Sequence, residues 1–206
     1  MSLVVNGSSA STIDPIEEGT YLGVCSMLID LGMQYSEQYK NRSRKVLIGW
    51  EIPEETIELD DGPHPRTISK TYTASLNERA NLRADLAAWR GRDFTDTELA
   101  AFDLHNIIGA SCLINIIHST RDGRTYANIS SIMALPKGMA KGKLAEPPIV
   151  FDLDTDPLEA LDKMPKWIVE RIKKSETYQE RITAPATGAE LHKLSDEEAG
   201  DGELPF

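Results

Sequence analysis

The sequence predicts a mainly β protein: a small five-stranded barrel with a helix between its third and fourth strands, then C-terminal helices and an acidic tail. Three observations lead to this prediction. Five runs rich in apolar and β-branched residues are separated by turn residues, which is typical of strands. Between the third and fourth runs the hydrophobic period changes from two to 3.6 residues, which is typical of a helix. The 206 residues, 40% of them hydrophobic, suffice for one domain with its own core.

The first three strands are expected at residues 19–31, 45–52 and 67–74, where Val, Ile, Leu, Thr and Tyr are frequent. The first two are joined by the polar stretch GMQYSEQYKNRSRK, which we interpret as a loop. Residues 1–15 are expected to form a flexible lead before the domain.

Two helices are expected next. Residues 75–78 (SLNE) have the pattern of a capping box and predict a helix that runs to Arg90 and ends at Gly91. Its apolar side contains Leu82, Leu86 and Trp89. Residues 95–98 (TDTE) form a second capping box and predict a short helix through Phe102.

The last two strands are expected at residues 111–118 and 126–134, paired antiparallel through a turn at Asp122-Gly123. Residues 136–148 predict a mobile basic loop with Lys137, Lys141 and Lys143. A short strand is expected at residues 149–153.

These elements predict four parts: the lead, a barrel domain at residues 16–154, a helical extension at 155–182 and a disordered tail at 183–206. Helices are expected from Pro157 and across residues 165–178. The tail contains six acids and one base and has no hydrophobic period.

Five strands with a helix between the third and fourth is the order of the OB-fold, a Greek-key barrel. Other small barrels and α+β sheets share this order. In the OB-fold, ligands bind to strands two and three and to the loops joining strands one to two and four to five. The basic and aromatic residues of this sequence gather in the corresponding segments. The first loop contains Tyr35, Tyr39, Lys40, Arg42, Arg44 and Lys45; the second contains Arg121, Arg124 and Tyr126; the strands between contain Trp50, Lys70 and Tyr72.

Single-stranded nucleic acid needs cations along its phosphates and flat faces for its unstacked bases, and both loops supply both. Each strand residue can point to a ligand or into the core, and for Trp50 the pattern favours the core. For Tyr35 and Tyr39 it favours exposure. Arg79, Arg83 and Arg90 share one side of the predicted helix, which is more typical of a solvated face than of a binding site.

Net charge does not exclude a polyanionic partner. The whole chain has a charge of −11, but residues 35–143 contain 15 Lys and Arg against 14 Asp and Glu. The acidity therefore lies at the ends of the chain.

The chain ends in acidic residues followed by an apolar tip, formed by Asp201, Glu203, Leu204, Pro205 and Phe206. This ending resembles the C-terminal tip of bacterial single-stranded DNA-binding proteins. The resemblance implies a docking peptide for replication, recombination and repair enzymes, whose Phe ring enters an apolar pocket while its carboxylates meet basic groups. The central run from YTASLNERAN to SSIMALPKGM resembles a family of small bacteriophage and prophage proteins thought to bind single-stranded DNA, over roughly residues 16–140.

No catalytic or cofactor motif is found: the histidines are scattered, and there is no glycine-rich phosphate loop or nucleophile elbow. We therefore expect neither an enzyme nor a cofactor.

Asp152, Asp154 and Asp156 lack the glycine and glutamate of a calcium loop, which favours a solvated edge over a metal site. Cys25 and Cys112 are expected to be buried free thiols of a cytoplasmic protein. No apolar run approaches the length of a membrane span, so no membrane partner is expected.

Two hypotheses follow. In the first, this is a phage-type single-stranded DNA-binding protein that protects the strand and recruits partner enzymes through its tail. In the second, it is a phage structural or adaptor module with a small β-barrel and no nucleic-acid partner. The sequence is compatible with a homo-oligomer in both.

Overall fold

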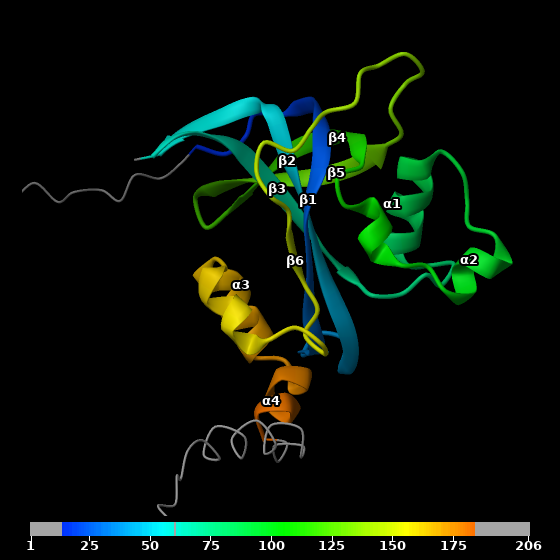
Figure 1. Ribbon diagram of the computed structural model, residues 1–206, viewed down its shortest axis with the longest axis vertical. Helices are drawn as coiled ribbons and strands as arrows, with labels where there is room; N and C mark the ends of the chain where they lie inside the picture. Colours follow the sequence, from blue (N-terminus) through cyan, green and yellow to red (C-terminus); the bar gives the residue numbers. More distant parts are fainter. Residues whose placement is uncertain (1–13, 60, 184–206) are drawn as a thin grey trace, which may run out of the picture. The chain divides into compact units, whose positions relative to one another are not determined.

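The computed structural model describes residues 14–59 and 61–183, and over these the chain is mainly β (Figure 1). The strands are β1 (Gly19–Ser36), β2 (Asn41–Leu59), β3 (Gly62–Thr73), β4 (Ser111–Arg121), β5 (Arg124–Met133) and β6 (Ile149–Phe151). The α-helices are α1 (Asn81–Arg90), α2 (Asp96–Ala100), α3 (Lys166–Lys173) and α4 (Glu176–Thr183), with 3₁₀ turns η1 (Leu104–Ile107) and η2 (Leu158–Lys163).

Five strands form a curled antiparallel half-barrel in the order β3-β2-β1-β4-β5, and β6 pairs in parallel with β1. The two outer strands of this order, β3 and β5, also contact each other. Helix α1 lies between β3 and β4 in the sequence and packs against β3 and β5. The predicted order of three strands, a helical insert and two strands is confirmed.

The chain divides into two compact units, which we describe separately. The first contains the described residues 14–29 and 45–151. The second contains residues 30–44 and 152–183, so the end of the β1–β2 hairpin belongs to the same unit as the C-terminal helices.

The core of the first unit forms because alternate residues of each strand point inward. On β2 the inward residues are Val46, Ile48, Trp50 and Ile52, all buried. The rings of Trp50 and Trp89 lie 5.7 Å apart between centroids, so α1 contributes directly to this core. Cys25 and Cys112 are buried free thiols, as predicted.

Helix α1 buries the predicted stripe of Leu82, Leu86 and Trp89 but begins later than predicted. The box at residues 75–78 does not cap it: the helix starts at Asn81 after Ala80, and Ser75 Oγ instead accepts a hydrogen bond from the backbone N–H of Asn77. The second predicted box is confirmed, because Thr95 and Glu98 cap α2 reciprocally.

The second unit buries Leu31, Leu153, Leu161, Ile168 and Ile172. The stretch GMQYSEQYKNRSRK is not one long loop, because β1 continues to Ser36 and β2 begins at Asn41. The helix predicted over residues 165–178 is two helices, α3 and α4, separated at Lys174 and the buried Ser175.

Candidate nucleic-acid interface

The β4–β5 hairpin presents two arginines and a tyrosine from a tight turn. Asp122 and Gly123 have φ angles of 49° and 74°, as a two-residue hairpin turn requires, so the predicted turn is confirmed. Arg121 pairs with Arg124 as the last rung of the ladder, and both are exposed. Neither forms an ion pair with any residue that the structure describes. Tyr126 follows on β5 with 46% of its surface exposed.

A groove of about 420 Å³ opens beside this hairpin, between β3 and β5. Its wall on β3 is formed by residues 66–69, and its wall on β5 includes Tyr126. Arg66 donates to the backbone carbonyl of Asp14 and lies 3.9 Å from Glu55, so this cation is held at the rim. We call the hairpin tip and this groove together the hairpin surface; it contains Arg66, Arg121, Arg124 and Tyr126.

Residues 35–44 of the first predicted loop lie in the second unit, and Lys45 lies in the first. Tyr35 and Tyr39 are 50% and 70% exposed, and Lys40 has a φ angle of 50° at the turn. Arg42 is ion-paired with Glu176, a residue 134 positions away in the sequence. Its charge is therefore already compensated.

Arg44 is bound more extensively than Arg42. Its guanidinium donates to both carboxylate oxygens of Asp30, with Nε 3.1 and 3.2 Å from them, and to Asp154 at 2.6 Å. These bonds raise the pKa of Arg44 above its ordinary value. Two carboxylates around one cation leave a net negative charge, which disfavours a phosphate there.

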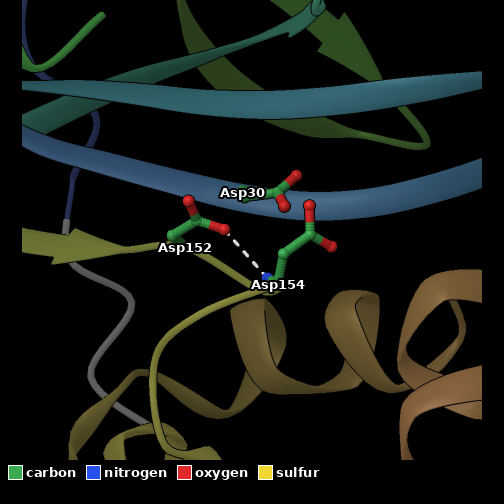
Figure 2. A group of neighbouring side chains, drawn as sticks. All are labelled: Asp30, Asp152 and Asp154. Carbon is green, nitrogen blue, oxygen red and sulfur yellow. Dashed lines mark hydrogen bonds between the residues drawn. The ribbon is translucent and has the colours of Figure 1, made fainter.

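The same carboxylates form an acidic cluster with Asp152 (Figure 2). One oxygen from each of Asp30, Asp152 and Asp154 lies within 4.8 Å of the others, as in a site for a divalent cation. The cluster differs from the predicted trio, because Asp156 accepts from the backbone N–H of Asp152 and Asp30 of β1 takes its place. Arg44 supplies the positive charge, so we interpret the cluster as a structural ion-pair network.

Trp50 and Tyr72 are buried, with 0% and 3% of their surfaces exposed. The core position of Trp50 that the sequence favoured is thus confirmed. The ring of Tyr72 packs in the same core, and its hydroxyl donates to Asp85 at 2.8 Å. A buried ring offers no face to an unstacked base, so we leave both residues out of the proposed surface.

Lys70 and Lys45 are half-buried, and each ammonium contacts a polar side chain. Lys70 Nζ lies 2.7 Å from Asp85, and Lys45 Nζ lies 2.7 Å from Thr73 Oγ1. Of the predicted helix cations, Arg83 pairs with Asp93 and Arg90 with Glu98. Arg79 is exposed and has no ion pair among the described residues.

Residues 136–148 form an irregular segment that contacts β1, β2 and β3. The backbone N–H of Ala145 donates at 2.9 Å to Glu51, a carboxylate that is only 3% exposed. Glu146 bonds His64, and Gly142 approaches Val24 so closely that an added Cβ would lie 2.5 Å from its side chain. Two of these strands, β2 and β3, are the ones that the sequence predicted to offer a ligand face. Its three lysines, Lys137, Lys141 and Lys143, are exposed.

No model of a known protein family matches the chain, and a search of curated proteins finds no match. Over the described residues, no helix is long and apolar enough to cross a membrane. The predicted docking tip at Asp201, Glu203, Leu204, Pro205 and Phe206 lies outside the described residues.

Proposed function

We propose that this chain is a single-stranded DNA-binding protein of the phage type, whose half-barrel is an OB-fold and whose hairpin surface holds the strand. The observation that carries the proposal is the β4–β5 hairpin, where exposed Tyr126 lies near two arginines that have no described ion-pair partner. Arginines bind phosphates, and the tyrosine ring offers a stacking face that tolerates any base.

The strand order supports the fold part of this proposal. An OB barrel is a Greek-key arrangement in which β1 has β2 and β4 as neighbours and β3 approaches β5. The order β3-β2-β1-β4-β5, with a contact between β3 and β5 and a helix before β4, matches that arrangement. The loop between β4 and β5 is one of the two loops with which OB-folds bind oligonucleotides.

The acidic C-terminal tip gives the proposed protein its second role. Because the tip resembles that of bacterial single-stranded DNA-binding proteins, we propose that it recruits enzymes that process the bound strand during replication or recombination. An acidic peptide ending in a phenyl ring and a carboxylate suits a basic-rimmed apolar pocket on such an enzyme.

The hairpin surface is tested with variants and a matched control. Replacing Tyr126 with alanine should raise the Kd for labelled oligo-dT by about 5- to 150-fold, because stacking on one aromatic residue is worth about 1–3 kcal/mol. The double variant Arg121→Gln/Arg124→Gln should lower the slope of log K against log salt by up to about 1.4, or about 0.7 for each lost phosphate contact.

Arg42→Gln is the control, since Arg42 is exposed yet ion-paired with Glu176. Its Kd should match that of the unmodified chain. Fluorescence anisotropy gives all three values. If the Arg42 variant lost affinity while the hairpin variants did not, the strand would be bound by the β1–β2 hairpin instead. If no variant and no unmodified chain bound oligo-dT, the phage adaptor hypothesis would take precedence.

A further inference from the structure

A second groove of about 470 Å³ lies where the end of β3 meets the segment that leads into α1. Its lining contains three cations, Lys45, Lys70 and Arg79, with the hydroxyls of Thr73 and Ser75 and the amide of Asn77. None of its lining residues, all of them described, is Asp or Glu. We call it the β3–α1 groove. It lies wholly within the first unit.

Two of the three cations of this groove, Lys45 and Arg79, have no ion pair among the described residues, whereas Lys70 is paired with Asp85. Lys45 is the register partner of Thr73, and its Nζ donates to the Thr73 hydroxyl, which is neutral. Lys70 Nζ contacts Asp85, which also accepts from Tyr72. Arg79 is exposed and has no ion pair among the described residues. Counting Asp85, three cations face one carboxylate, so the groove is positive.

Asp85 holds Lys70 in place and accepts hydrogen bonds from both Lys70 and Tyr72. Burial raises the pKa of Tyr72, and the neighbouring Asp85 raises it further, so the phenol stays protonated and donates to that carboxylate. With two hydrogen bonds Asp85 is well satisfied, and an anion that enters the groove meets ammonium, guanidinium, hydroxyl and amide donors. Such a donor set suits the tetrahedral oxygens of a phosphate group.

The β3–α1 groove continues the hairpin surface along one strand. Residues 66–69 of β3 line the groove beside Tyr126, and residues 70–73 line the β3–α1 groove. Because a strand advances about 3.3 Å per residue, these eight residues span about 20–25 Å along β3, and the two grooves lie one after the other on this stretch. A nucleic-acid strand held at the hairpin can thus reach both.

We propose that the β3–α1 groove binds a phosphate group, supplied by the backbone of a bound single strand or by free phosphate. The first source rests on the proposed function; the second does not. Lys45 and Arg79 provide the main attraction, and Lys70, held by Asp85, forms the floor.

The test is an NMR titration of the ¹⁵N-labelled full chain with inorganic phosphate, against sodium chloride of equal ionic strength. Amides of residues 71–81 should shift and saturate with phosphate but not with chloride. The variant Lys45→Gln/Arg79→Gln should weaken phosphate binding by about tenfold, or about threefold for each cation. Arg92→Gln is the control, because Arg92 is exposed in the same unit but pairs with Glu98 outside the groove.

Both variants change surface side chains, and the spectra themselves report whether they fold. Three results would overturn the proposal: amide shifts that are absent, amide shifts spread evenly over all lysines and arginines, or phosphate binding that is unchanged in the double variant. Anisotropy with oligo-dT separates the two sources: a Kd raised about tenfold in the double variant assigns the phosphate to the strand. Saturable phosphate shifts without any oligo-dT binding assign it to free phosphate, and the proposed function then fails while the groove stands.

Discussion

Removing the charge of Arg44 should destabilise the protein without weakening the binding of oligo-dT that we propose. Arg44→Met keeps most of the side-chain stem and leaves Asp30, Asp152 and Asp154 together with no cation. Side chains of Arg44 and Asp30 are 36% and 15% exposed, so the pair lies between a surface pair and a buried one. Breaking it should cost about 2 kcal/mol, because exposed pairs contribute about 0–1 and breaking buried pairs costs about 3–5 kcal/mol.

For a chain of this size, a loss of about 2 kcal/mol corresponds to a fall in Tm of about 4–8 °C, measured by circular dichroism. Calcium should recover part of the loss in the variant alone, because the uncompensated carboxylates then bind a divalent cation. Arg42→Met, two residues along the same strand with a more exposed ion pair, should change Tm by no more than about 3 °C. Equal Tm values for Arg44→Met and the unmodified chain would refute this reasoning, as would a loss of oligo-dT affinity.

Three further changes have defined outcomes. Asp85→Ala removes the acceptor shared by Lys70 and Tyr72 and should lower the free energy of unfolding in urea by about 3 kcal/mol. Asp85→Asn keeps an acceptor oxygen and should lower it by about 1 kcal/mol. Equal effects of the two variants would contradict the shared-acceptor role. Hydrogen bonds to Glu146 and Asp61 raise the pKa of His64 above 6.5, so these contacts are complete below pH 6.5 and are lost as the pH rises through the raised pKa. Proton NMR of the His64 ring measures that pKa, and a value at or below 6.5 would contradict the contacts. We propose that the acidic tail competes with DNA for the basic surface. A chain ending at Ile182 should then bind oligo-dT more tightly than the full chain at low salt, and unchanged anisotropy curves would rule out that competition.

Local patterns were sufficient where a feature is encoded by neighbouring residues. Asp122-Gly123 predicted the β4–β5 turn because its backbone needs positive φ angles at both positions. The apolar residues Leu82, Leu86 and Trp89 predicted α1 because their spacing places them on one side of a helix. The pattern SLNE failed as a helix start because a capping box has meaning only where the helical stripe begins, and Leu82 is the first residue of that stripe.

Features that depend on distant residues were not predictable from such patterns. Glu176 is 134 residues from Arg42, and Asp154 is 110 residues from Arg44, so nothing local showed that these cations are paired. The polar ends of β1 and β2 were interpreted as a loop because they lack a hydrophobic period. A two-stranded ribbon needs no such period, since backbone hydrogen bonds can continue it. The anchoring of residues 136–148 on Glu51 was missed as well, although a glutamate inside the apolar run KVLIGWEI was a signal that a buried partner was needed.

The account is tested most directly by anisotropy of labelled oligo-dT and of a duplex of equal length, each titrated with the full chain at two salt concentrations. We expect binding that favours the single strand and weakens as salt increases, because in our proposal the arginines of the hairpin bind phosphates while Tyr126 stacks on an unpaired base. Equal binding of duplex and single strand, or no binding of either, would contradict the proposal that this chain holds single-stranded DNA.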